Sequence, residues 1–278
     1  MVSAIRDNSA SAGQPSIIVD LASHERPMRD ALQRAAVFLG YAVNAAEGTP
    51  LSSVRLKAPI ELSVGVPDPI PEEQRPAYQQ QFRNWVIGQA LIELDQNYQR
   101  FVVSSIETIA DLEHFKTHRT LCLVHKPNLA NTWTVHEQFH SPAGHTDQSH
   151  LDESRYLRSL GNARNCLAHD SGLVTERRLT DGDTMPIRWP GQDIYQTLHS
   201  GERQLLQREH PFEVRQEDIG TTLSAEAVVR EKIYRAGDTI LFSSTDLSEI
   251  IFFYQILAMR IGAELHRLVE EAGRELNA

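Results

Sequence analysis

Cysteine, long apolar runs and positive charge are all scarce in this sequence of 278 residues. Two cysteines, Cys122 and Cys166, cannot build a disulfide framework, so nothing indicates an oxidising compartment and the cytoplasm is expected. The longest apolar stretch, 250–259, is interrupted by Gln255 and is far too short to cross a bilayer. Residues 1–16 show no basic segment followed by an apolar one, so a secretory signal is not expected. The sequence therefore favours a protein that has no membrane partner.

The shortage of positive charge gives the chain a formal net charge of -10. Affinity for nucleic acids draws on Lys and Arg side chains that displace counterions, so a general DNA-coating protein is not expected. A nuclease needs only a local basic groove. Segment 155–178 contains five arginines, which permit contact with RNA, although such clusters are also often simply solvated surfaces. They are Arg155, Arg158, Arg164, Arg177 and Arg178.

Apolar residues recur at helical spacing in four long stretches, which we expect to be helices: 25–46, 72–110, 152–169 and 246–276. A shorter helix is expected at 194–206, after a loop at 181–192 that is rich in Gly, Pro and Asp. Two short strands around a turn are expected at 227–234 and 239–242. Asp246, with Glu249 three residues later, has the pattern of a capping box and predicts the start of the last helix.

The remaining segments predict one domain preceded by an arm. Residues 1–16 are small, polar and aperiodic, and we expect them to be disordered. The proline-rich stretch 48–71 is expected to be a loop with a short strand at 60–66. The His-rich segment at about 125–150 is expected to be a long irregular insertion. Residues 17–278 should thus form a single, mainly α domain, a helical bundle with a small β-hairpin.

Residues suited to chemistry gather at the end of the helix expected at 152–169. Residues 164–174 are RNCLAHDSGLV. At about 100° per residue Asn165 and His169 share one face of a helix, whereas Arg164 lies about 140° from His169. Only the length of the Arg164 side chain can bring its guanidinium near the imidazole. This arrangement suits a polar edge that faces a partner surface better than a self-contained pocket.

These residue types suit the cleavage of RNA without a metal ion. A histidine titrates near neutral pH and can take the proton of a 2′-hydroxyl or give one to the departing 5′-oxygen. The planar, permanently charged guanidinium of Arg164 matches phosphate oxygens, and Asn165 can orient His169 or bind an oxygen. The same residues also fit an ordinary helix end, with a surface arginine, a capping asparagine and a histidine near the last carbonyls.

The R-N-x-x-x-H pattern at a helix end, followed by a polar residue and glycine, resembles the signature of the HEPN superfamily. The longer run is similar to the RNC-hydrophobic-x-H-x-x-G form of many bacterial members. The resemblance covers only this helix and its exit. It implies a helical bundle that dimerises, so that two motifs face each other in one composite site. Many members are ribonucleases of toxin–antitoxin or phage-defence systems, and others are non-catalytic modules that bind RNA, nucleotides or proteins.

By this resemblance Arg164 would hold the phosphate, Asn165 would orient the groups and His169 would transfer the proton. The nearby Arg158, Arg177 and Arg178 are expected to contact the substrate. Some members add an acidic residue from the preceding long helix, for which Glu93 and Asp95 are the candidates. No cofactor is expected. The expected partners are RNA, a second copy of the chain, and an antitoxin or a defence-system protein.

A competing motif lies upstream, where residues 136–140 are HEQFH, formally the H-E-x-x-H of zinc metalloproteases. His136 and His140 would hold the ion, and the Glu137 carboxylate would act as general base. Pro142 disfavours helical geometry just after His140, and the preceding residues lack apolar support. We therefore expect an exposed polar loop and no metal. Incidental or structural metal binding by this His-rich segment is the next alternative, and a zinc hydrolase is the least favoured one.

Overall fold

The computed structural model describes residues 2–5, 16–48, 71–118, 131–140, 148–206 and 220–277. Most of these residues are helical, which confirms the expected mainly α class. The helices are α1 (Leu21–Gly48), α2 (Arg75–His118), α3 (Thr132–His140), α4 (Gln148–Asp170) and α5 (Ser244–Asn277). Among the helices of these residues, none combines the length and the apolar character that a bilayer crossing requires.

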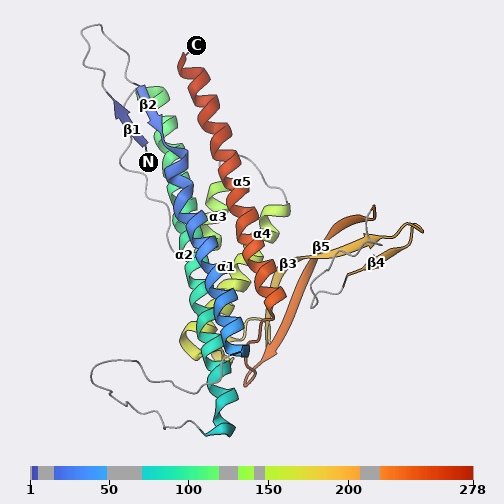
Figure 1. Ribbon diagram of the computed structural model, residues 1–278. Helices are drawn as coiled ribbons and strands as arrows, with labels where there is room; N and C mark the ends of the chain where they lie inside the picture. The colour runs from blue at the N-terminus through green and yellow to red at the C-terminus, as the bar shows by residue number, and fades with distance from the viewer. Residues whose placement is uncertain are drawn as a thin grey trace, which may run out of the picture.

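The helices α1, α2 and α5 run side by side along the length of the molecule, and α3 and α4 pack against them (Figure 1). The core lies where α2, α4 and α5 meet, and Leu94, Leu157 and Leu257 are among its fully buried side chains. Buried residues of α5 recur every three or four positions, as an amphipathic helix requires. They are Ile250, Phe253, Tyr254, Leu257, Ile261 and Leu265.

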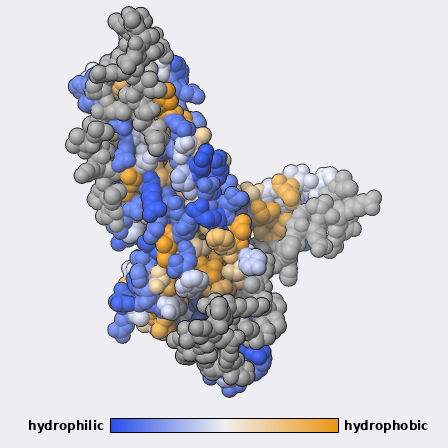
Figure 2. Space-filling model, turned by 60° about the vertical axis from the view of Figure 1, so that its left-hand side comes forward, coloured by the Kyte–Doolittle hydropathy of each residue, from blue (hydrophilic) through white to orange (hydrophobic). Residues whose placement is uncertain are grey.

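A three-stranded antiparallel sheet leaves the helical body as an arm (Figure 1). Its central strand, β3 (Thr184–Thr197), pairs along its whole length with β5 (Thr222–Arg235), and the short β4 (Arg203–Leu205) lies on the other side of β3. The root of the sheet is buried, and the Trp189 indole donates a hydrogen bond to the Glu249 carboxylate of α5 at 3.1 Å. Figure 2 shows hydrophobic residues gathered where the sheet leaves the helical body.

The sheet corrects three predictions. The expected loop at 181–192 and the expected helix at 194–206 are wrong, since β3 covers most of the first segment and β3 and β4 cover much of the second. The strand expected at 227–234 is confirmed within β5. The strand expected at 239–242 is wrong, because within this segment only Thr239 pairs, in an isolated bridge with Leu173 beyond the end of α4.

Prolines misdirect the prediction of β3. Pro186 and Pro190 lie in the half of the strand that pairs only with β5, because β4 pairs only with Tyr195–Thr197. A strand tolerates proline where one edge needs no ladder hydrogen bond. On this open edge the Ser159 hydroxyl of α4 accepts the backbone N–H of Arg188 at 2.7 Å. The Ser159 side chain thus accepts a backbone N–H of β3 that would otherwise need a carbonyl from a further strand.

The irregular insertion expected at about 125–150 is also wrong for its described part, because residues 132–140 form α3 and α4 begins at Gln148. Val135 and Phe139, four residues apart, face the core and are buried. Two apolar anchors one turn apart suffice for a helix of nine residues once a core is there to receive them.

Two smaller corrections concern helix and strand ends. Val2–Ile5 (β1) pairs with Ser16–Val19 (β2), so the expectation of a disordered arm is wrong for these residues. At the start of α5 the capping box is formed by Ser243 and Asp246, whose side chains each accept the other's backbone N–H at 3.1 and 2.8 Å. The strand expected at 60–66 lies outside the described residues.

Candidate functional site

The motif segment closes α4 where this helix packs tightly on α2. A side chain in place of Gly88 of α2 would put its Cβ 3.2 Å from that of Leu167, so glycine permits the close approach. The helix then ends in two left-handed residues, Ser171 and Gly172, with φ of 51° and 83°. The Gly172 N–H donates to the carbonyl of Cys166 at 3.1 Å. Gly172 therefore stops the helix, which leaves His169 in its last turn.

One face of α4 carries a continuous row of polar side chains. Its members are spaced three or four residues apart, so they share that face. They are Arg155, Arg158, Asn162, Asn165 and His169, and we call them the polar row. Arg155, Arg158 and His169 are exposed, and the two asparagines are half-buried. At a rise of 1.5 Å per residue the row is about 21 Å long, enough to contact several consecutive phosphates of one strand.

A groove of about 540 Å³ runs between α4 and the root of the sheet, and Arg155 and Arg158 line it together with Arg188 of β3. Arg155 is paired with Asp152 at 3.2 Å, and Arg188 is paired with Glu231 at 2.5 Å. Arg158 forms no ion pair within the part of the chain that the structure describes. Of these arginines, Arg158 is therefore the one with a guanidinium most available to an anion.

The structure places Arg164 on a different side of α4 from the polar row. Its guanidinium lies 3.3 Å from the carboxylate of Asp95 on α2, which is almost completely buried. The Tyr254 hydroxyl of α5 donates to the same carboxylate at 3.4 Å, and Thr132 of α3 also hydrogen-bonds it. Burial raises the pKa of Asp95, although Arg164 opposes the shift. Arg164 thus belongs to a polar centre shared by four helices.

The pairing of Arg164 with Asp95 also decides between Glu93 and Asp95, the two acidic candidates on α2. Asp95 is the one that meets the motif. Glu93 instead points toward α1, where it accepts a hydrogen bond from Arg34 at 2.5 Å. A period of 3.6 residues puts positions two apart about 200° around a helix, so the two carboxylates must face different neighbours.

Arg177 and Arg178 both bind Asp170 at the end of α4. The hydrogen bond from Arg178 to the Asp170 carboxylate is the main cause that lowers the pKa of Asp170. Arg178 also donates to the backbone carbonyl of Asn165 at 3.3 Å. These contacts give both arginines a local role in holding the helix exit. About two thirds of the Arg177 side chain remains exposed and can still meet a phosphate.

Cys166 has no place in the chemistry. Its side chain is buried, and its thiol donates to the carbonyl of Leu173 at 3.3 Å. Burial raises the pKa of this thiol to about 11. Because the thiolate is the nucleophilic form, a Cys166–His169 nucleophile pair is disfavoured.

The H-E-x-x-H motif lies on α3, so the expectation of an exposed polar loop is wrong for residues 136–140. His136 is almost fully buried, and its Nε2 atom lies 3.3 Å from Oε2 of Glu153 on α4. His140 is the last residue of α3, at a helix end as expected from Pro142. The Glu137 side chain is exposed, away from the buried pair. Sequence spacing reveals the two histidines, but Glu153 joins them only through the packing of α4 on α3.

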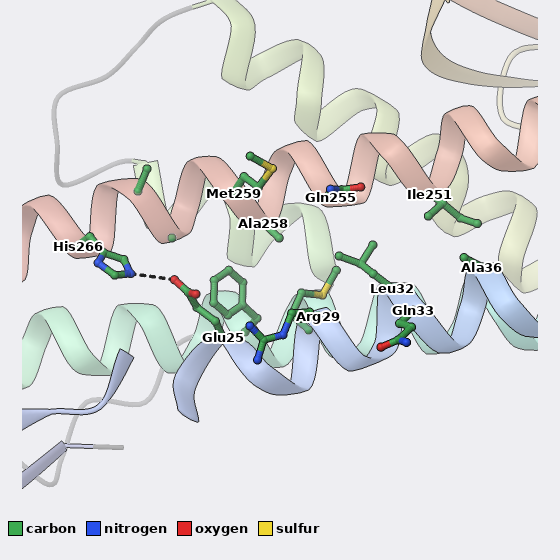
Figure 3. Close-up of a pocket in the computed structure, with 14 residues that line it drawn as sticks. Glu25, Arg29, Leu32, Gln33, Ala36, Ile251, Gln255, Ala258, Met259 and His266 are labelled. Atoms are coloured by element: carbon green, nitrogen blue, oxygen red, sulfur yellow. Dashed lines mark hydrogen bonds and ion pairs between the residues drawn. The ribbon is translucent and has the colours of Figure 1, made fainter. Parts of the chain in front are cut away.

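An apolar hollow lies elsewhere. A groove of about 610 Å³ separates α1 from α5, and Leu32, Ile251 and Met259 line it (Figure 3). The His266 imidazole and the Glu25 carboxylate close one end at 3.0 Å. Its lining includes Glu25, Arg29 and His266 but is mostly apolar and contains no Ser, Thr or Cys, so we do not assign the site to it. Comparison of the chain with family models, with curated proteins and with solved structures found no match.

Proposed function

We propose that this chain is a metal-independent endoribonuclease of HEPN type that acts in the cytoplasm as a toxin or phage-defence effector. One observation carries the proposal. His169 stands exposed at one end of the polar row, and the other end of the row lines a groove with three arginines. A proton-transfer group and phosphate-binding groups therefore share one face of one helix, as cleavage of a polyanion requires.

RNA would lie along α4, with consecutive phosphates bound by Arg155 and Arg158 and the scissile phosphate beside His169. The 2′-oxygen attacks phosphorus, the bond to the 5′-oxygen breaks, and the products are a 2′,3′-cyclic phosphate and a 5′-hydroxyl. One proton leaves the 2′-hydroxyl and one joins the 5′-oxygen. Two imidazoles would divide these transfers between them, which supports a homodimer in which His169 of each copy faces the same phosphate.

A dimer would also give Arg164 a route to the phosphate. About a quarter of its side chain is exposed, and its partner Asp95 has a pKa raised by burial. A phosphate that approaches from a second copy would compete with this carboxylate for the guanidinium. The pairing of Arg164 with an acidic residue of the long helix agrees with what the family resemblance implies, and the mainly helical fold is compatible with the bundle that it implies.

The test is incubation of the purified chain with total RNA in excess EDTA. Cleavage should persist under chelation. The His169→Ala variant should lose about 100-fold or more of the rate, the usual contribution of a proton-transfer residue. His199→Ala, which removes an exposed histidine of the sheet arm, is the matched control and should cleave like the parent. Cleavage that persists in His169→Ala would refute the proposal.

A non-catalytic module that binds RNA, a nucleotide or a protein is the second candidate, and one observation favours it. In the single chain Arg164 is held by Asp95 rather than directed toward His169. Absence of cleavage at any protein concentration, together with RNA binding that Arg158→Ala weakens, would identify this module. Binding that falls with salt would show that phosphate contacts drive it.

A further inference from the structure

We infer that His136, His140 and Glu153 form a binding site for a zinc ion, which fixes α3 to α4. The inference goes beyond the ribonuclease proposal and does not depend on it. At 1.5 Å per residue, Glu153 and His169 lie about 24 Å apart along α4. An ion bound at Glu153 is therefore too far away to act on a phosphate at His169.

The three ligand atoms are already gathered. His136 and His140 lie one turn apart on α3, with ring centroids 4.7 Å apart, and Glu153 faces them from α4. One nitrogen from each ring and one carboxylate oxygen all lie within 4.8 Å of one another. Ligands about 2.0 Å from a tetrahedral zinc ion are about 3.3 Å apart. The separation of 3.3 Å between His136 Nε2 and Glu153 Oε2 is therefore already that of two zinc ligands.

Neighbouring groups orient two of these ligands. The Tyr98 hydroxyl of α2 lies 2.7 Å from Nδ1 of His136. Burial, and then the charge of Glu153, raise the pKa of Tyr98, so this hydroxyl stays neutral and its oxygen can accept a hydrogen bond from the N–H at Nδ1. The lone pair of Nε2 then points at Glu153. Arg260 of α5 binds Oε1 of Glu153, the carboxylate oxygen other than the one that faces His136. Hydrogen bonds from neighbouring side chains are usual around histidine and carboxylate ligands of metals.

The donor set selects the ion. Two imidazole nitrogens and one carboxylate oxygen suit zinc, whereas magnesium and calcium require oxygen ligands almost exclusively. Burial also favours a cation at this position. The Glu153 carboxylate is nearly buried, whereas Arg260, its cationic partner, is more than half exposed to water, so its charge balances that of the carboxylate only weakly. Three protein ligands leave one position of a tetrahedral ion for water or a further side chain.

The site is assigned a structural role. In a zinc hydrolase the glutamate between the two histidines activates the bound water, but here Glu137 is exposed on the outer side of α3. Helix α3 has only nine residues, too few to be stable alone in water. An ion that joins its two histidines to α4 would hold it in place, and with it the Thr132 side chain that hydrogen-bonds Asp95.

The test uses the full chain, stripped with EDTA, dialysed and titrated with Zn²⁺ in a calorimeter without RNA. We expect one ion per chain and a melting temperature that rises with zinc concentration. Cobalt in place of zinc should give the visible absorption band of a four- or five-coordinate ion. His140→Ala and Glu153→Gln should each lower zinc affinity more than tenfold, because loss of a ligand weakens binding more than loss of a group that only orients a ligand.

The matched control is His118→Ala on α2. His114 and His118 also lie four residues apart, with ring centroids 4.4 Å apart, but lie near the surface. This variant should bind zinc like the parent. His140 is only partly buried, so His140→Ala tests the site without emptying the core, and circular dichroism of the zinc-free variants checks their fold. Absence of zinc binding by the parent chain, or a loss in His118→Ala equal to that in His140→Ala, would overturn the inference. Neither result bears on RNA cleavage in EDTA.

Discussion

Replacement of Tyr98 by phenylalanine should destabilise the fold, although it removes only one oxygen atom. Tyr98 is fully buried and His136 nearly so, and 2.7 Å separates the hydroxyl from the imidazole Nδ1. The phenylalanine ring would keep the packing of the tyrosine ring, including its edge-on contact with Tyr254 at 5.7 Å. The change therefore opens almost no cavity and isolates the loss of one buried hydrogen bond.

The expected loss in the free energy of unfolding follows from the hydrogen bond that the His136 imidazole loses. A buried polar atom left without its partner costs about 1 to 3 kcal/mol, so Tyr98→Phe should lower the free energy of unfolding by about 2 kcal/mol. Unfolding entropy is about 2 cal/mol/K per residue, or about 0.6 kcal/mol/K for a chain of this length. The melting temperature should then fall by about 3 °C.

Urea unfolding followed by circular dichroism, in EDTA, measures this loss. The midpoint should fall while the m-value stays constant, since the surface exposed on unfolding hardly changes. Tyr41→Phe is the control, because Tyr41 is about four fifths exposed and its hydroxyl already faces water. A Tyr98→Phe variant within about 0.5 kcal/mol of Tyr41→Phe would refute the reasoning, because surface changes of this kind stay within that range.

Two further predictions concern the exit of α4 and the pH dependence of stability. Gly172→Ala should lower the free energy of unfolding by about 1 to 3 kcal/mol, because φ is 83° and the new Cβ would lie 3.1 Å from the Asn84 side chain. Urea unfolding measures this loss, and a loss below about 0.5 kcal/mol would contradict the prediction. Burial lowers the pKa of His24 below 6.5, so its contribution to stability is present above pH 6.5 and is lost as pH falls through the lowered value. The loss in unfolding free energy between pH 7.5 and 5 should therefore be smaller in His24→Gln, and equal losses in the two proteins would show that His24 is not the titrating group.

The long helices could be predicted because each depends on a local pattern. Residues 246–276 show an apolar repeat of 3.6, and α5 follows it from Ser244 to Asn277. Only the capping residue differs, since Ser243 rather than Asp246 caps the helix. Asp246 instead accepts Ser243 N–H and pairs with Lys232 of β5, a contact that depends on the return of a distant strand.

Helix α3 and strand β3 could not be predicted because distant residues decide them. Pro142 and the polar residues around His136 predict a loop, but Val135 and Phe139 find a core built by other helices. The candidate site, too, could be predicted only in part. Spacing alone puts Asn165 and His169 on one face of α4, whereas the partner of His136 on α4 follows from the packing of two helices.

In a single chain, the two groups of the proposed chemistry, the His169 imidazole and the Arg164 guanidinium, lie on different sides of α4. The His169 side chain is exposed, while Arg164 lies where α2, α3, α4 and α5 meet around Asp95. Within one chain, the arginine that shares a face with His169 and is free of an acidic partner among the described residues is Arg158. Under the proposed mechanism, a second copy would be needed to bring a phosphate to Arg164, but not to bind RNA along α4. Binding in a single copy and cleavage only in a pair would make the activity depend on chain concentration, which is a means of regulation that suits a toxic nuclease.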